Sequence, residues 1–480
     1  MNSRLQNSYS FTAAPLRVQF ITTSLPVGGA EVLLLNLVKR LDKNRFSPEV
    51  VCLKEAGELG EEFSRVVPVH DNWLQSKWDA RVLFRLAKHF RQSKTDAVIT
   101  VGAGDKMFWG RAAARLAGVP VICSALHSTG WPDGIGTLNR LLTRITDGFI
   151  AVAQQHTEHL VQFEKFPRDR VFMIPNGVDT DRFRPNHAMR GWLRDSLGLP
   201  RDCKLTGIVA ALREEKNHFQ FIDAAKLVLE QIPNAHFLIV GDGPERPAIE
   251  AHIERLGVSQ QIHLLGNRSD TERILAGLDA FCLTSRNEAN PVSILEALSC
   301  GVPVVAPDVG SISETVLHKH TGLLTEPVDA RSTCQALLQM LSNPSFASVM
   351  GLAGRQLVRN DWSLDAMVAG YELVISSLYS AKMPRIAQAA PSIAEPQNAE
   401  PVPTAQLADP TLVHLTAETD SGPAVKARVS TEEAVVPESF EILFANQLEF
   451  ETSTPAISAA HTNPLVTLEM HSEDAEAVSF

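Results

Sequence analysis

We predict an α/β protein with two doubly wound parallel sheets, and three observations lead to this fold class. Short apolar runs alternate with helical segments from residue 16 to about residue 380, a pattern typical of parallel strands that are buried between helices. The 480 residues, 44% of them hydrophobic, can build sizeable cores in about three domains. No stretch approaches the ~20 consecutive apolar residues of a membrane span.

The first domain is predicted over residues 14–185. Its opening strand, residues 16–22, leads to Gly28 and Gly29 and then to an apolar helix. Glycines at such a turn allow the backbone to approach a ligand at the positive end of the helix, although the pair is more often structural. His127 follows a later strand, at the sheet edge where sites form. A histidine there is either a polar loop residue or a functional one.

The helix near residues 79–92 has two interpretations. Its apolar stripe would pack on the sheet, which is the favoured interpretation, or its basic face would contact an anionic membrane surface. The stripe contains Trp78, Val82, Leu86 and Phe90, and the basic residues are Lys77, Arg81, Arg85, Lys88, Arg91 and Lys94.

The second domain is predicted over residues 200–362. The loop after its first strand carries Arg213 and Lys216, side chains suited to a diphosphate. The next strand ends in a Gly-Asp-Gly turn at Gly241, which is not a dinucleotide motif because Arg246 occupies the third glycine position. Asn267 and Arg268 follow the strand after that.

Residues 280–315 form the most informative segment. Glu288 and Glu296 have seven residues between them, and Asn290 and Pro291 predict an N-cap and a first helical residue before Val292. A helix N-terminus between two carboxylates suits a sugar nucleotide, with its hexose, diphosphate and ribose. Alternatively, Ser293 and Glu296 form a capping box, and Glu296 only caps a helix.

These segments resemble the retaining glycosyltransferases of family 4, also called group 1, whose fold is GT-B. The resemblance covers about residues 16–380 and rests on Glu-x7-Glu, on the Gly-Gly-Ala-Glu segment, on Ile-Pro-Asn-Gly-Val-Asp at residues 174–179 and on Gly-Asp-Gly-Pro. Two positions depart from the family pattern. Ala289 replaces the usual glycine, and Ala211 replaces an arginine, with Arg213 two residues later as a substitute.

The resemblance implies that the two domains face a cleft, and that a helix over residues 363–380 crosses back to pack on the N-terminal domain. It implies catalytic roles for Glu288, His127 and Lys216, and it places Gly28 and Gly29 in a cleft loop. It also implies a set of donor-binding residues: Arg213, Lys216, Gly241, Asn267, Arg268, Glu288, Asn290, Pro291, Val292 and Glu296.

The implied reaction is the metal-independent transfer of a hexose from a nucleotide diphosphate sugar, with UDP-sugars favoured over GDP-mannose. The acceptor would be a glycan or a lipid-linked glycan of cell-envelope or exopolysaccharide biosynthesis. No cofactor, metal or nucleic acid is expected, and Asp179-Thr180-Asp181 is interpreted as a turn and helix start. Two alternatives stay open: a nucleotide-sugar epimerase or phosphorylase of the same fold, and a non-catalytic binding protein, which Ala211 would favour.

The compartment follows from what the sequence lacks. We see no signal peptide, and six scattered cysteines predict reduced core thiols. We therefore expect a cytoplasmic protein, with peripheral contact at the inner face of the membrane as an option. Residues 385–480 are predicted to be a disordered, Pro/Ala-rich acidic tail, because residues 386–480 hold 15 acidic and two basic residues against 40 and 42 in the rest.

Overall fold

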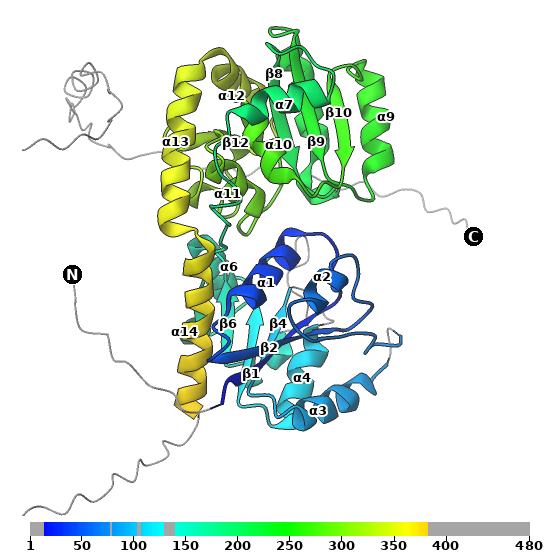
Figure 1. The fold of residues 1–480 in the computed structure, drawn as a ribbon, viewed down its shortest axis with the longest axis vertical. Helices are drawn as coiled ribbons and strands as arrows, with labels where there is room; N and C mark the ends of the chain where they lie inside the picture. The colour runs from blue at the N-terminus through cyan, green and yellow to red at the C-terminus, as the bar shows by residue number, and fades with distance from the viewer. Residues whose placement is uncertain (1–13, 77–78, 103–106, 129–139, 383–480) are drawn as a thin grey trace, which may run out of the picture. The chain divides into compact units, whose positions relative to one another are not determined.

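The structure, a computed structural model, describes residues 14–76, 79–102, 107–128 and 140–382. These residues belong to one compact unit and contain two parallel sheets with helices on both faces (Figure 1). The predicted fold class is confirmed. The tail predicted over residues 385–480 lies outside the described residues.

The first sheet has seven strands in the order β3-β2-β1-β4-β5-β6-β7. All neighbouring strands pair in parallel, and the order reverses between β1 and β4. The strands are β1 (Leu16–Thr22), β2 (Phe46–Cys52), β3 (Val69–His70), β4 (Ala97–Val101), β5 (Val121–Ala125), β6 (Gly148–Ala151) and β7 (Val171–Met173).

Helices cover both faces of this sheet because its strands are apolar on both sides. Val18 and Phe20 of β1 pack in one core with α1 and α14, whereas Ile21 packs in a second core with α3 and α4. The helices are α1 (Gly29–Arg40), α2 (Gly60–Ser64), α3 (Val82–Gln92), α4 (Met107–Ala117), α6 (Gln154–Gln162) and α14 (Leu364–Lys382).

The stripe predicted on α3 faces the sheet. Val82, Leu86 and Phe90 are fully buried in the second core, as the packing interpretation requires. Lys77 and Trp78 lie outside the described residues. Phe84, which was not part of the predicted stripe, is 66% exposed on the opposite side of α3.

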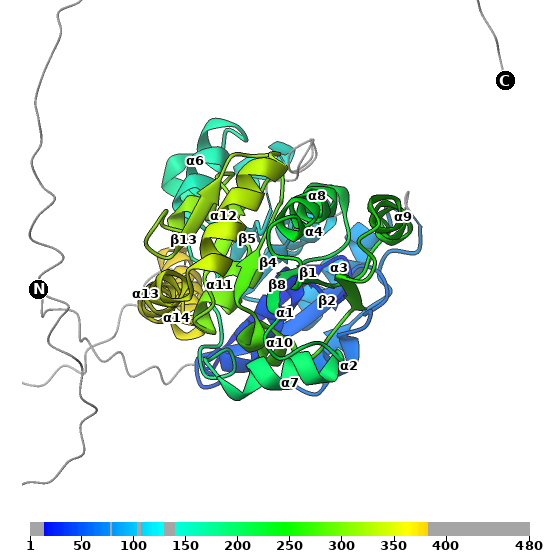
Figure 2. The same cartoon turned by 90° about the horizontal axis from the view of Figure 1, so that it is seen from above.

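The second sheet has six parallel strands in the order β10-β9-β8-β11-β12-β13, which reverses between β8 and β11. The strands are β8 (Lys204–Val209), β9 (Ala235–Val240), β10 (Ile262–Gly266), β11 (Ala280–Cys282), β12 (Val304–Pro307) and β13 (Gly322–Thr325). The helices are α7 (Ala188–Ser196), α8 (His218–Leu229), α9 (Arg246–Leu256), α10 (Thr271–Gly277), α11 (Val292–Ser299), α12 (Ala330–Ser342) and α13 (Pro344–Asp361). Figure 2 shows α8, α9 and α12 on one side of this sheet and α7 and α10 on the other.

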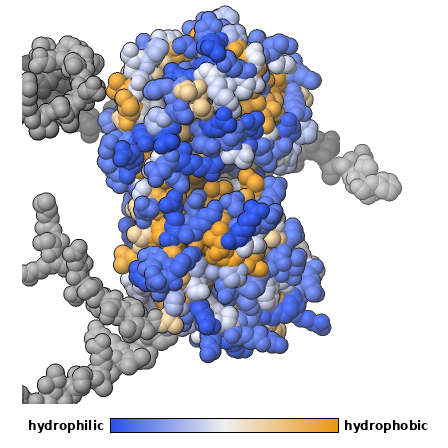
Figure 3. Space-filling view, viewed as in Figure 1, coloured by the Kyte–Doolittle hydropathy of each residue, from blue (hydrophilic) through white to orange (hydrophobic). Residues whose placement is uncertain are grey.

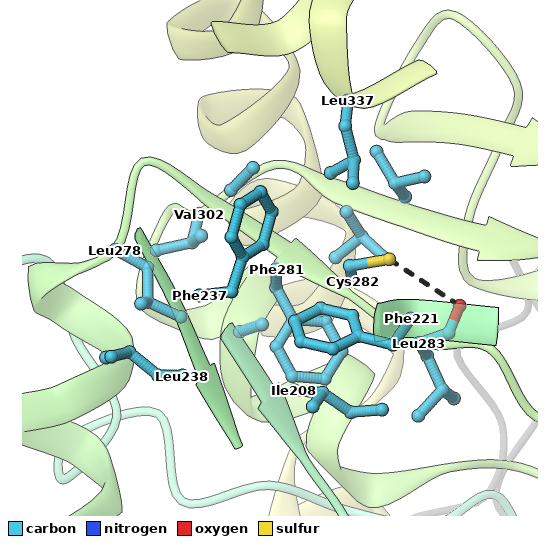
Figure 4. Close-up of a cluster of buried hydrophobic side chains, with 14 of the residues drawn as sticks. Ile208, Phe221, Phe237, Leu238, Leu278, Phe281, Cys282, Leu283, Val302 and Leu337 are labelled. Carbon is cyan, nitrogen blue, oxygen red and sulfur yellow. Dashed lines mark hydrogen bonds between the residues drawn. The ribbon is translucent and has the colours of Figure 1, made fainter. Parts of the chain in front are cut away.

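Aromatic rings fill the centre of the core around the second sheet (Figure 4). Phe221 of α8 and Phe237 of β9 meet edge to face with ring centroids 5.9 Å apart, and Phe281 of β11 is fully buried beside them. Edge-to-face pairs add about 0.5–1.5 kcal/mol beyond the area that they bury. This core holds the strand ends from which the candidate site projects.

The six cysteines are free and buried, which confirms the prediction of core thiols. Burial raises the pKa of the Cys52 thiol to about 12, so this thiol stays protonated at neutral pH. Within the described residues, no helix combines the length and the apolarity that crossing a membrane requires. Hydrophilic residues cover most of the face in Figure 3.

Candidate active site

Two loops meet at the point where the strand order of the second sheet reverses. Lys216 follows β8 and Glu288 follows β11, and a reversal between neighbouring parallel strands opens a crevice at their carboxyl ends. Lys216 Nζ donates to Glu288 Oε1 at 2.6 Å, and Ser285 Oγ donates to the same oxygen at 2.7 Å. Glu288 is 8% exposed. The structure therefore brings Lys216 and Glu288 together as a buried, charge-assisted pair.

Backbone contacts fix both members of the pair. Ser311 N donates to Glu288 O at 3.1 Å, and Gly310 packs so closely that a Cβ there would overlap this carbonyl oxygen. Gly310 also has a φ of +53°, which favours glycine. On the other loop, Thr284 Oγ1 donates to the carbonyl oxygens of Lys216 and Asn217 at 3.2 and 3.0 Å. The pair is therefore positioned before any ligand binds.

The helix after Glu288 begins later than the sequence predicts. Pro291 has extended backbone angles, so α11 starts at Val292, and Asn290 is not its N-cap. Ser293 then lies inside the helix, so no capping box with Glu296 forms. Pro291, at the N-cap, offers no side-chain hydrogen bond to α11, and free N–H groups at a helix N-terminus suit an anion.

In the part of the chain that the structure describes, Asn290 and Asn176 carry buried polar atoms without hydrogen-bond partners. Asn290 is 5% exposed, and neither its Oδ1 nor its Nδ2 has a hydrogen bond. Asn176 Nδ2 donates to Asn290 O at 2.9 Å, while its own Oδ1 is unpaired. Each buried polar atom without a hydrogen bond lowers the stability of the folded state by about 1–3 kcal/mol. Several such atoms close together therefore indicate a place where a polar ligand or water binds.

The glycine loop of the first sheet lies against the same helix end. Gly28 is the N-cap of α1, and a Cβ at Gly29 would lie 3.5 Å from Val292 Cγ2. The N-termini of α1 and α11 therefore approach each other. Glu31, in the first turn of α1, was not singled out from the sequence. Burial raises the pKa of its carboxyl, with Arg213 acting in the opposite direction.

His127 lies beside Asn176 and is neutral at physiological pH. Burial lowers the pKa of His127 to about 4, against the smaller opposing effect of a hydrogen bond with the Asn176 side chain. Within the described part of the chain, Nδ1 of His127 has no hydrogen-bond partner. His156 of α6 interacts with it electrostatically, and burial lowers the pKa of His156 to about 3. His127 can therefore exchange hydrogen bonds with a ligand, but it is not a cation at pH 7.

The predicted residues farther along the second sheet have other contacts. Gly241 has a φ of +137° and packs against Ala210 O, so it supports the loop that carries Arg213 and Lys216. Arg213 is exposed. Asn267 and Arg268 follow the edge strand β10, and Arg268 forms a two-pronged ion pair with Asp270, both distances being 2.8 Å. Across the described ranges, no hydrogen bond links them to the Lys216–Glu288 pair.

Glu296 is half-buried on α11 and lies near another ion pair. Burial raises the pKa of Glu296 to about 8, with a further increase from Glu272 and an opposing effect of Arg182. Arg182 Nη2 donates to Glu272 Oε2 at 2.9 Å. Glu296 therefore keeps its proton at neutral pH in the ligand-free protein.

The carboxylates of Asp179 and Glu314 accept hydrogen bonds from backbone N–H groups near the site. Asp179 Oδ1 accepts from the backbone N–H groups of Asp181 and Arg182 at 3.2 and 3.0 Å. The turn predicted there is correct, but no helix starts, because the segment continues as a turn. Glu314 accepts from Gln154 N and Gln155 N at 2.9 and 2.7 Å. It thus caps α6 of the first sheet from the loop after β12.

Comparison with known families identifies the chain. The family model described as "Glycosyl transferases group 1" matches residues 191–357, and the model described as "Glycosyltransferase Family 4" matches residues 27–182. The chain belongs to the group 1, family 4 glycosyltransferases. The two matches cover both sheets and include the loops with Lys216 and Glu288. Membership makes the chain a glycosyltransferase.

Named relatives align with most of this glycosyltransferase. A galactosyltransferase of Escherichia coli, named for UDP-Gal and α-D-GlcNAc-diphosphoundecaprenol, is 26% identical over 74% of this chain and 95% of its own. A GDP-mannose-dependent mannosyltransferase of Corynebacterium glutamicum, named for monoacylated phosphatidylinositol monomannoside, is 28% identical over 74% of this chain and 96% of its own. By class, the chain is a hexosyltransferase.

Solved structures share the fold. Anabaena HepE, crystallised with UDP and glucose, superposes with a TM-score of 0.68 at 21% identity and covers 75% of this chain and 100% of its own. A glycosyltransferase from Rickettsia africae gives a TM-score of 0.66 at 18% identity over 76% of this chain and 99% of its own. The predicted GT-B architecture of two Rossmann-like domains is confirmed.

Proposed function

We propose that this glycosyltransferase moves a hexose from a nucleotide diphosphate sugar to a glycan or lipid-linked acceptor, with retention of the anomeric configuration and without a metal ion. The buried Lys216–Glu288 pair beside the N-termini of α1 and α11 carries the proposal. UDP-sugars are the favoured donors and GDP-mannose is the second candidate, and both nucleotides occur among the names of the relatives.

The site would act by positioning and charge stabilisation. The bond between the anomeric carbon and the diphosphate oxygen breaks, and the acceptor oxygen bonds to the same face of that carbon. The acceptor proton passes to the leaving diphosphate. Lys216, Arg213 and the helix N-termini would stabilise the negative charge that develops on the diphosphate. Such preorganised charge needs no covalent intermediate on a glutamate.

Glu288 and His127 would hold the hexose. The carboxylate of Glu288 is fixed by Lys216 and Ser285, so its remaining lone pairs can accept hydrogen bonds from sugar hydroxyls. Neutral His127 would hydrogen-bond near the anomeric carbon through Nδ1, which has no hydrogen-bond partner among the described residues. These contacts would keep the reacting carbon close to the diphosphate side of the site, where the acceptor enters.

Turnover of a donor panel tests this function. Nucleotide release is measured from UDP-, GDP- and ADP-sugars, with EDTA present and with glycan or lipid-linked acceptors added. Acceptor-dependent release from one donor, unchanged by EDTA, supports the proposal. Epimerised donor without release would favour an epimerase, and release that requires inorganic phosphate would favour a phosphorylase. Binding without cleavage of any donor would favour a binding protein.

Glu296 would bind the ribose hydroxyls, and its raised pKa predicts a pH-dependent stability. Between the unfolded pKa near 4.5 and the folded pKa of about 8, the folded state binds more protons than the unfolded state. The contribution of Glu296 to stability is therefore present at low pH and is lost as the pH rises through this window. We expect Glu296→Gln to unfold at a higher temperature than the wild type at pH 8, and the difference to shrink at pH 5.

The same Glu296→Gln variant should bind UDP more weakly at pH 8, because in the proposed complex Glu296 loses its proton and accepts from both ribose hydroxyls as a carboxylate, whereas an amide offers one acceptor oxygen. Thermal unfolding from pH 5 to pH 8 and calorimetric titration with UDP measure the two effects. Glu326→Gln, at an exposed position after β13, is the control. A pH-independent difference in unfolding temperature, or unchanged UDP affinity, would contradict this role of Glu296.

We further propose that α3 brings the enzyme to the cytoplasmic face of an anionic membrane, where lipid-linked acceptors lie. Phe84 is 66% exposed, and the neighbouring Arg81 and Lys88 are also exposed. Basic residues near an anionic surface contribute about 1 kcal/mol each. We expect co-sedimentation with vesicles that contain phosphatidylglycerol, and weaker binding at high salt.

Phe84→Ser combined with Arg81→Gln should reduce this vesicle binding, while Leu352→Ser, at a position 63% exposed on α13, should not. Equal binding to neutral phosphatidylcholine vesicles would refute an electrostatic contact. Unchanged binding of the Phe84 and Arg81 variant would assign the contact to another surface.

A further inference from the structure

Three metal-binding side chains gather on the first sheet, away from the Lys216–Glu288 pair. Glu49 of β2, His70 of β3 and His89 of α3 each offer one ligand atom, and these atoms all lie within 4.8 Å of one another. His70 Nε2 and Glu49 Oε2 are 3.2 Å apart. All three residues are half-buried, so a small ion can reach them from solvent.

The sheet places the cluster on the side that faces α3. Glu49 pairs in register with Gln19 of β1, and Val51 pairs with His70. Because side chains alternate along a strand, Glu49 points to the same face as Val51, which packs against α3 in the second core. His89 approaches from α3 itself. Its ring meets that of His70 at an edge, with centroids 4.7 Å apart.

Gln19 supplies a second, independent observation. It is 1% exposed in the middle of β1. Its Nε2 lies 3.0 Å from Glu49 Oε2, 3.1 Å from His89 Nε2 and 3.0 Å from Ser93 Oγ, whereas its Oε1 has no hydrogen-bond partner among the described residues. An amide nitrogen has two N–H donors, so three neighbours exceed its capacity while the buried oxygen stays unsatisfied. The polar groups of the described residues alone therefore leave Gln19 unsatisfied beside this cluster.

We propose that Glu49, His70 and His89 bind a divalent transition-metal ion of the zinc type. Two imidazoles and one carboxylate are ligands that Zn²⁺ prefers. At Zn–N and Zn–O distances of about 2.0–2.2 Å, tetrahedral ligand atoms lie about 3.3 Å apart, close to the separation of His70 and Glu49. Gln19, with its amide reversed, can present Oε1 to the ion or to a metal-bound water.

The surroundings favour a structural ion. The ring of Trp73 lies 5.0 Å from that of His89, and an apolar wall beside a metal site limits the access of water. The ion would join α3 to the β2–β3 edge of the sheet. Glu49 lies in the middle of β2 and the neighbouring Gln19 in the middle of β1, whereas Gly28 follows the carboxyl end of β1. This metal site is therefore distinct from the proposed donor site, whose chemistry uses no metal.

A metal titration of the untagged, full-length chain tests the site. Protein stripped with a chelator is titrated with Zn²⁺ against a chromophoric competitor, and with Co²⁺ followed by its visible absorption. We expect one Zn²⁺ ion to bind tightly per chain. We also expect Co²⁺ to show the intense visible absorption of an ion in a coordination site of low symmetry. Zn²⁺ should also raise the unfolding temperature of the wild type, because an ion that binds only the folded state stabilises it.

Variants assign the ligands. His70→Ala and His89→Ala should each weaken Zn²⁺ binding at least about tenfold, and Glu49→Gln should do the same with little change in side-chain size. His320→Ala, at an exposed position, should bind as the wild type does. No bound Zn²⁺ in the wild type would overturn the proposal, and so would binding that survives in His89→Ala and Glu49→Gln while both variants unfold cooperatively. Because the readout is metal binding, failure here is separable from failure of the proposed transferase reaction.

Discussion

Replacing Lys216 with alanine is expected to lower kcat/KM for the sugar donor by about 10²–10³-fold, or about 2.7–4 kcal/mol of transition-state stabilisation. The ammonium group lies 2.6 Å from Glu288, and in the proposed complex it also donates to the leaving diphosphate. Its removal leaves the developing charge without a donor, and it leaves Glu288 buried without its cation. Steady-state kinetics with the preferred donor measure the loss.

Lys204→Ala is the matched control for Lys216→Ala. Lys204 begins β8, whereas Lys216 follows the opposite end of the same strand, so both variants remove one lysine from the second sheet. The control should retain the kcat/KM of the wild type. If Lys216→Ala retains more than half of the wild-type kcat/KM, Lys216 does not act on the diphosphate and the site assignment is wrong.

Gly310→Ala is expected to unfold at a lower temperature and to lose at least about 10²-fold in activity, because a misplacement of 1 Å in a site can cost this much. An L-residue in the left-handed region costs about 1–2 kcal/mol. In addition, a Cβ at Gly310 overlaps Glu288 O, so the Glu288 loop must move. The clash acts on the backbone of the residue that is proposed to hold the hexose.

Gly257→Ala separates the two effects at Gly310. Gly257 has a φ of +68°, and a Cβ there would meet no atom within 4 Å. Gly257→Ala places an L-residue in the left-handed region without a steric clash. It should therefore be less stable than the wild type but keep the wild-type activity. Equal activity of Gly310→Ala and Gly257→Ala would show that the position of Glu288 does not depend on the Gly310 contact.

The fold and the two loops that carry Lys216 and Glu288 were predicted from the sequence because they depend on local patterns, whereas the ion pair between the two side chains was not predicted. Residues 16–22 were predicted as a strand, and the structure has β1 over the same residues. Lys216 and Glu288 each follow an apolar strand, and parallel strands bring such loops to one edge of a sheet. The start of α11 was missed by one residue, because the extended backbone of Pro291 delays the helix to Val292.

The remaining contacts could not be predicted because their partners are distant in the sequence. Asn176 meets Asn290 across 114 residues, and Glu314 caps α6 at Gln154 across 160 residues. Neither pair leaves a periodic or motif signal. The metal cluster could not be predicted for the same reason. Glu49, His70 and His89 come from three separate elements, and their spacing lacks the short intervals of a zinc motif.

A crystal structure of the chain with UDP would decide whether Lys216 and α11 hold the diphosphate, since it locates that group. We expect diphosphate oxygens within hydrogen-bond distance of Lys216 Nζ and of the first N–H groups of α11, with the ribose hydroxyls at Glu296. A diphosphate bound away from Lys216 and from the N-terminus of α11 would contradict this expectation.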